Sequence, residues 1–147
     1  MKITIGGDHA SVEMKDAVKK VLAEIGGIEI NDVGTFGSES VDYPDVAEKI
    51  CAEVVSGKSA RGIVICGTGI GISISANKIK GIRCALCNDV FSAKMSREHN
   101  DANVLAMGAR VIGLGTASEI VRAWIATDFS NGERHQRRIN KMMALEK

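Results

Sequence analysis

Short runs of apolar residues alternate along the chain with longer segments in which apolar residues recur every three to four positions. The short runs are typical of β-strands and predict strands at residues 2–6, 28–33, 61–66, 82–87, 103–107 and 111–112. The longer segments are typical of amphipathic helices and predict helices at residues 11–25, 44–55, 90–98, 116–127 and 133–145, with one more ending near residue 79. Gly26, Pro44 and Asp89 support these boundaries as a helix end, a helix start and a helix cap.

This alternation predicts an α/β fold, in which a parallel sheet is covered by helices on both faces. A length of 147 residues corresponds to one domain, and no linker or internal repeat divides the chain. In such sheets, ligands bind beyond the carboxyl ends of the strands. The loops at those ends hold residues 7–9, 34–35, 66–71 and 88–89, and we look for chemistry there first.

The charge balance argues against a polyanionic partner. The chain has 19 Lys and Arg residues and 18 Asp and Glu residues, a net charge of +1, with one Trp, one Tyr and three Phe. Such a chain has no overall field toward nucleic acid or membrane and few platforms for stacking bases. It also lacks a signal-like N-terminus and the ~18 consecutive apolar residues that would span a bilayer. We therefore expect a cytoplasmic protein with neither nucleic acid nor membrane as partner.

The four cysteines are expected to be free thiols in that compartment: Cys51, Cys66, Cys84 and Cys87. Cys84 and Cys87 form a CxxC pair, but a separation of three residues places them on opposite faces of a strand. No second ligand pair stands elsewhere in the chain to complete a zinc site. We interpret this pair as core thiols and expect no metal site.

The most informative segment is RGIVICGTGIGIS, residues 61–73, in which a strand ends at Cys66 and glycines follow at alternate positions. Glycine permits the tight turns that bring backbone N–H groups toward one point, and the helix that begins there adds the positive end of its dipole. The segment predicts an anion cradle with the Cys66 thiol at its edge, suited to act as a base or nucleophile.

Three other interpretations of this segment stay open from the residues alone. In a dinucleotide site, Asp89 would be the ribose-binding acid about 20 residues on, but the spacing is GxGxG and Ile72 replaces the third glycine of GxGxxG. The segment also fits a plain glycine-rich turn beside a core thiol. A phosphate cradle without catalysis is the third.

The histidines and the basic C-terminal helix supply further candidates. His9 follows the first strand on the ligand side, and His99 ends a helix in a polar cluster where an imidazole can exchange protons near pH 7. His135 is interpreted as an exposed helix residue. Arg134 and Arg138 are four residues apart and share a helix face suited to a phosphate, although a solvated surface helix has the same spacing.

Five segments together resemble the ribose-5-phosphate isomerase B family, which also includes galactose-6-phosphate isomerase subunits and allose-6-phosphate isomerases. They cover nearly the whole chain in order: GGDHA, DYPD, ICGTGIGISISANK, SREHNDANVLAMGAR and ERHQRRI. The resemblance implies a single Rossmann-like domain over residues 1–147 that isomerises a phosphorylated sugar without cofactor or metal. It also implies a homo-oligomer, dimer or tetramer, whose active sites combine residues of two subunits, with the helix at 133–145 reaching the partner.

The resemblance further implies roles for single residues. Cys66 matches the base that moves a proton between C1 and C2 of the open-chain sugar, and His99 matches the residue that opens the furanose ring. Ile72 stands where other branches of the family carry a glutamate, so the chain resembles the cysteine branch. The remaining implied residues form the loop that holds the enediolate, the contacts to the sugar and the cations around the phosphate: Gly67, Thr68, Gly69, Ile70 and Gly71; Asp8, His9 and Asn100; Arg110, Arg134 and Arg138. Thr68 is also expected to hydrogen-bond the substrate or relay a proton.

The expected reaction is the interconversion of ribose 5-phosphate and ribulose 5-phosphate through a cis-enediolate. Two alternatives stay open. One is an isomerase of a six-carbon sugar phosphate, either allose 6-phosphate or galactose 6-phosphate. The other is a module that binds a sugar phosphate without turning it over.

Overall fold

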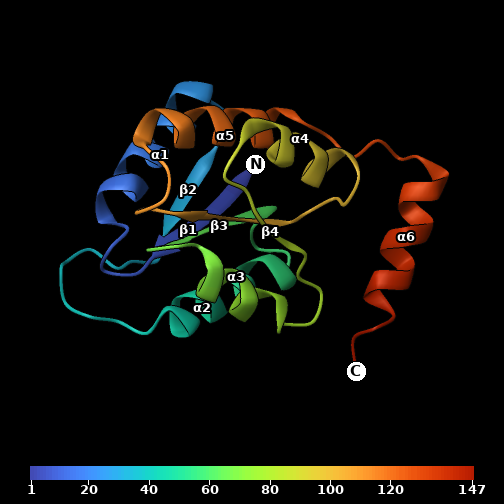
Figure 1. Cartoon of the computed structure of the whole chain (residues 1–147), viewed down its shortest axis with the longest axis horizontal. Helices are drawn as coiled ribbons and strands as arrows, with labels where there is room; N and C mark the ends of the chain where they lie inside the picture. Colours follow the sequence, from blue (N-terminus) through green and yellow to red (C-terminus); the bar gives the residue numbers. More distant parts are fainter.

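A computed structural model describes the whole chain, residues 1–147. Its centre is a sheet of five parallel strands in the spatial order β2-β1-β3-β5-β4 (Figure 1). The strands are β1 (Lys2–Gly7), β2 (Glu29–Asp32), β3 (Arg61–Cys66), β4 (Cys84–Leu86) and β5 (Val104–Gly108). The helices are α1 (Val12–Ile25), α2 (Tyr43–Val55), α3 (Ile70–Asn77), α4 (Val90–Glu98), α5 (Leu114–Ala126) and α6 (Glu133–Met143). The predicted α/β fold is confirmed.

Helices cover both faces of the sheet (Figure 1). Helices α1, α4 and α5 pack together on one face, and α2 and α3 pack on the other. The central strand β3 contributes side chains to the hydrophobic cores on both faces of the sheet. Ile63 and Ile65 enter the core that includes α1 and α5, whereas Val64 and Cys66 enter the core that includes α2 and α3. A strand buried on both faces requires a continuous apolar run, which RGIVIC provides.

One predicted strand, residues 111–112, is wrong. The N–H groups of Val111 and Ile112 both donate to the carbonyl of Gly108, at 3.0 and 3.2 Å, so this segment is a turn that leads into α5. Val111 is 53% exposed, so its apolar side chain does not mark a core position. The remaining predicted boundaries lie within two residues of the observed ones.

Cys84 and Cys87 lie on opposite faces of the sheet, as predicted. Cys87 belongs to the core beneath α1 and α5, and Cys84 packs against the core beneath α2 and α3. All four cysteines are free thiols.

Helix α6 stands apart from the rest of the chain (Figure 1). Of its residues, only His135 and Ile139 are buried. A groove of about 860 Å³ lies between the end of α6 and the segment that joins α3 to β4. None of the helices has the length and apolar character needed to cross a membrane.

Candidate active site

The strand order places a topological switch point beside the end of β3. Strands β1 and β3 are neighbours, but β2 follows β1 on one side of the sheet, whereas β5 and β4 follow β3 on the other. The loops after β1 and β3 therefore diverge, and ligands bind at such switch points in open α/β sheets. The edge where the strands end is called the carboxyl edge below, and the edge where they begin is called the amino edge.

A glycine turn connects β3 to α3 at the carboxyl edge. Gly69 has φ +77° and caps the N-terminus of α3. A Cβ atom there would lie 2.5 Å from Cδ1 of Leu86 and 2.8 Å from the backbone carbon of Met107. Both the backbone conformation and the space thus require glycine at this position.

This turn leaves a set of backbone donors free beside the Cys66 thiol. The N–H of Gly69 donates to Cys66 Sγ at 3.2 Å, and the N–H of Ile70 donates to Thr68 Oγ1 at 3.1 Å. The neighbouring N–H groups donate to no acceptor in the chain, namely those of Gly67, Thr68, Gly71 and Ile72. Free donors at a helix N-terminus attract negative charge. The structure therefore has the anion cradle that the glycine spacing predicts, with a sulfur atom at its edge.

Three more of the predicted site residues surround this turn. Asp8 is 7% exposed, and one of its oxygens accepts the N–H of Ala10 at 3.0 Å, which leaves the other free of chain partners. The next residue, His9, is half-buried and accepts the N–H of Val41 weakly at Nδ1. The Arg110 side chain packs against Gly67. We call these residues, with residues 66–71, the carboxyl-edge cluster.

Tyr43 also borders the cluster, and the site residues expected from the sequence did not include it. A Cβ atom on Gly71 would lie 2.5–2.8 Å from the ring and hydroxyl of Tyr43, so the ring lies directly over the start of α3. Tyr43 belongs to the DYPD segment, and it is the only tyrosine in the chain. The signal available in the sequence is its place in that segment.

The remaining predicted residues form a second group, the amino-edge cluster: His99, Asn100, Arg134 and Arg138. His99 caps the end of α4, and its ring lies 4.3 Å from that of His135 on α6. Arg134 and Arg138 flank His135 on the same helix, and both are exposed. His135 itself is 8% exposed, which corrects the prediction of an exposed residue, because its ring packs against His99.

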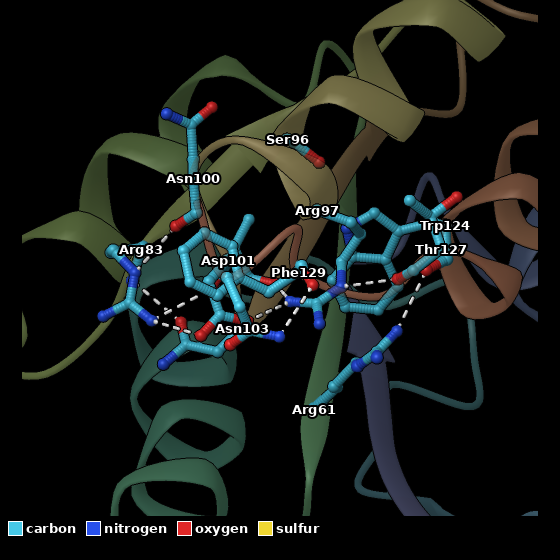
Figure 2. A network of polar contacts seen from close by, with 12 residues as sticks. Arg61, Arg83, Ser96, Arg97, Asn100, Asp101, Asn103, Trp124, Thr127 and Phe129 are labelled. Atoms are coloured by element: carbon cyan, nitrogen blue, oxygen red, sulfur yellow. Dashed lines mark hydrogen bonds and ion pairs between the residues drawn. The ribbon is translucent and has the colours of Figure 1, made fainter. Parts of the chain in front are cut away.

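A network of arginines holds the turn that carries Asn100 (Figure 2). Arg83 Nε donates to the carbonyl of Asn100 at 3.0 Å, and Arg97 Nη1 donates to the carboxylate of Asp101 at 2.9 Å. Arg97 Nη1 also donates to the carbonyl of Ala102 at 2.7 Å. Figure 2 shows the side-chain amide of Asn100 pointing away from these arginines, so it is free for a ligand.

The two clusters lie at opposite edges of the sheet. Asn103, just before β5, accepts the N–H of Gly62 near the start of β3, whereas Cys66 ends that strand. Six residues of extended chain separate the two ends of β3, a length of roughly 17–20 Å. One copy of the chain therefore brings Cys66 together with Asp8, His9 and Arg110, but it does not bring them to His99.

The other three cysteines lie in environments that disfavour a thiolate. Burial raises the pKa of Cys51 to about 12 and that of Cys87 to about 11, and it raises the pKa of Cys84 as well. No three His, Cys, Asp or Glu side chains are arranged to hold a metal ion.

Comparison with known proteins identifies the family of this chain. The family described as Ribose/Galactose Isomerase matches residues 3–142. The putative sugar phosphate isomerase YwlF of Bacillus subtilis is 57% identical, over 97% of this chain and 95% of its own. The ribose-5-phosphate isomerase B of Escherichia coli is 46% identical, over 99% and 96%. A solved structure of ribose-5-phosphate isomerase B from Clostridium thermocellum superposes with a TM-score of 0.95 at 51% identity, over 99% and 97%.

One relative is named for a different sugar. The D-erythrulose-4-phosphate isomerase of Pectobacterium atrosepticum is 42% identical, over 90% of this chain and 87% of its own. The names of these relatives thus differ in the sugar, and all of them describe an isomerase. The family resemblance carried by the five sequence segments is confirmed, and the chain belongs to the Ribose/Galactose Isomerase family, a family of isomerases.

Proposed function

We propose that this protein interconverts ribose 5-phosphate and ribulose 5-phosphate through a cis-enediolate, with Cys66 as the base. The observation that carries the proposal is the cradle of free N–H groups beside the sulfur of Cys66. An enediolate is an anion with two adjacent oxygens. Preorganised N–H donors stabilise the charge that develops on such oxygens, and they thereby lower the barrier to enolisation.

The proton transfers follow from the geometry of the carboxyl-edge cluster. The Cys66 thiolate removes the proton from C2 of the open-chain aldose, and the electron pair moves onto the carbonyl oxygen at C1. The N–H groups of the glycine turn hold the resulting oxygens. Thr68, exposed at the cradle, moves a proton between the two oxygens, and the Cys66 thiol returns its proton to C1 to give the ketose. No atom is gained or lost over the cycle.

Phosphate binding requires a second copy of the chain in this proposal. The arginine pair Arg134 and Arg138 lies with His99 at the amino edge, too far from Cys66 for one five-carbon sugar phosphate to span. A homo-oligomer that sets the amino edge of one subunit against the carboxyl edge of the next supplies both halves. Helix α6 stands away from its own sheet, in the position of an arm that reaches the partner (Figure 1).

The remaining functional assignments rest on residues in the same two clusters. Asp8 and His9 contact the sugar hydroxyls, Arg110 contributes positive charge, and Asn100 holds a substrate oxygen. Four unpaired cysteines suit a reducing compartment, which supports a cytoplasmic location.

Two other substrates have support of their own. The resemblance to allose- and galactose-6-phosphate isomerases supports a six-carbon sugar phosphate. The relative named for D-erythrulose 4-phosphate supports a four-carbon one. A module that binds a sugar phosphate without turnover would keep the cradle but have no need for a base.

Isomerisation of ribose 5-phosphate by the wild type and by Cys66→Ala tests the proposal. We expect wild-type turnover and a loss of at least about 10³-fold in the variant, because the base that moves the proton between C2 and C1 is removed. The matched control is Cys84→Ala, which removes a thiol outside the cradle and keeps near wild-type activity. Thermal unfolding of each variant establishes that the fold is intact.

Erythrulose 4-phosphate, allose 6-phosphate and galactose 6-phosphate are run in parallel. Turnover of only one of these would assign that sugar phosphate as the substrate and leave the proposed mechanism in place. Full activity of Cys66→Ala would reject Cys66 as the base, and binding without turnover of any sugar would reject the enzyme.

A further inference from the structure

His99 and His135 form a pair of imidazoles at the amino edge. Their ring centroids are 4.3 Å apart and the ring planes are inclined by 34°. His99 ends α4 with its side chain 41% exposed, so one face of its ring is open to a ligand. His135, on α6, is 8% exposed and covers the other face. The reaction proposed above gives His135 no role.

Ser130 holds the ring of His135 in place. Its hydroxyl oxygen lies 2.7 Å from His135 Nδ1 and accepts the N–H of Gly132 at 3.0 Å. A hydroxyl both donates and accepts, so this contact orients the His135 ring in either tautomer. The N–H of Ser130 also donates to the carbonyl of Glu98, so the serine is tied to α4, the helix that carries His99.

The surroundings disfavour a charged His135. Desolvation lowers the pKa of His135, and the neighbouring His99, Arg134 and Arg138 lower it further, whereas Glu98 opposes them. These are the titratable groups that face His135 from α4 and from its own helix.

We propose that His135 is a positioning residue for His99: held by Ser130, it packs against the ring of His99 and fixes the orientation of that ring toward the ligand. This inference rests on the proposed function, in which His99 opens the furanose ring. There His99 gives its proton to the ring oxygen as the C1–O4 bond breaks, and the same imidazole takes up the proton that the anomeric hydroxyl releases as the aldehyde forms. His99 thereby returns to its starting state.

Deuterium exchange separates this role from a structural one. Ribose 5-phosphate is mainly a closed ring and must be opened before it reacts. Ribulose 5-phosphate carries its phosphate on O5 and stays open, so its exchange with D2O at C1 needs only the Cys66 step. We expect His135→Ala and Ser130→Ala to lower the conversion of ribose 5-phosphate roughly tenfold, while deuterium exchange into ribulose 5-phosphate changes less than about twofold. Ser130→Thr keeps the hydroxyl and should restore the rate, and Gln136→Ala, an exposed neighbour on α6, is the control that leaves both rates unchanged.

NMR of the histidine rings tests the contact without using activity. In His135→Ala the ring-proton resonances of His99 should move, because the neighbouring ring at 4.3 Å is lost, and in Ser130→Ala they should move in the same direction. Equal losses of conversion and of deuterium exchange for His135→Ala, or unmoved His99 resonances, would overturn the inference. Moved resonances in a protein that turns over no sugar phosphate would instead reject the proposed function and leave the ring contact in place.

Discussion

The four thiols of this protein differ in environment by much more than their identical chemistry suggests. Burial raises the pKa of Cys51 to about 12 and that of Cys87 to about 11, so both are protonated at neutral pH. Burial raises the pKa of Cys84 too. Cys66 differs because its sulfur accepts a backbone N–H, from Gly69, beside the free N–H groups that precede α3. Only the thiolate is a nucleophile or base, so these environments favour Cys66 as the proposed base.

Alkylation makes this selection measurable. With iodoacetamide near neutral pH, we expect Cys66 to be labelled first and a saturating sugar phosphate to slow its labelling. Cys87 should react appreciably only as the pH approaches about 11, because a raised pKa moves the appearance of thiolate to higher pH. Peptide mapping after timed quenching gives the four rates. Labelling of Cys87 as fast as Cys66 at neutral pH would contradict the assignment.

The carboxylate of Asp32 holds the end of β2 to α1. It lies 3.1 Å from Lys15 Nζ and 3.0 Å from Lys19 Nζ, and it accepts the N–H of Gly34 at 2.9 Å. Burial by itself would raise the pKa of Asp32, but these three partners outweigh it and hold the pKa below its ordinary value. A carboxyl with a lowered pKa in the folded state contributes stability above its unfolded pKa. That contribution is lost as the pH falls through the folded value.

Replacing this carboxylate should therefore destabilise the protein in a pH-dependent way. Asp32→Asn leaves the ammonium of Lys15, which is 1% exposed, without its charge partner. We expect the free energy of unfolding at pH 7 to fall by about 3 kcal/mol. The deficit should hold down to about pH 4 and narrow below it, as the wild-type carboxyl is protonated as well. Urea titrations at several pH values measure it, with the exposed Asp16→Asn as the control; an equal deficit at all pH values would contradict the argument.

At the scale of elements, the turn from β3 to α3 carries the site because a buried strand and a short helix meet at one glycine. Gly69 sits against Leu86 of β4 and Met107 of β5, so the turn is clamped between its own helix and the neighbouring strands. Any shift of this turn moves the free N–H groups away from Cys66. The element therefore couples packing directly to chemistry.

The substitution Gly69→Ala tests that coupling. The new Cβ would meet the backbone of Met107 at 2.8 Å with φ near +77°, so we expect about 2 kcal/mol of destabilisation together with a loss of turnover. Gly115→Ala, in the first turn of α5 with nothing within 4 Å, should be neutral or slightly stabilising and remain active. Denaturant unfolding and initial rates on the same samples make the comparison. Wild-type rates for Gly69→Ala would show that the turn geometry is not required.

The elements themselves could be predicted from sequence, because strand and helix periodicities are local properties. Strand β3 is predicted to the residue, and Asp89 caps α4 as expected, its carboxylate accepting the N–H of Ser92 at 2.7 Å. The strand predicted at 111–112 is wrong because two apolar residues in a row do not reveal whether their side chains are buried, and Val111 is exposed. The burial of His135 is missed for a related reason: it depends on His99, which lies 36 positions away in sequence.

At the scale of the whole molecule, the candidate site is divided. The glycine turn and its thiol lie where strands end, and His99 lies where they begin, because the helix after a strand returns the chain to the opposite edge. The residue types could be predicted from the sequence, but their separation of roughly 17–20 Å needs the sheet. In the proposed function, such a site is complete only when two copies of the chain meet.

Mixing two inactive variants tests this division. If each active site takes Cys66 from one subunit and His99 from the other, a mixed dimer of Cys66→Ala and His99→Ala has one site with both residues intact and one site with neither. Random association gives half mixed dimers, each with one intact site of two, so activity on ribose 5-phosphate should reach about a quarter of the wild-type value. Co-refolding the two variants and assaying against each variant alone measures this recovery. If both residues instead served the site of their own subunit, every site in the mixture would lack one of them, and the activity would equal the average of the parents. The recovery therefore distinguishes a shared site from two separate ones by a change that folding defects cannot imitate, since a defect lowers activity and never restores it.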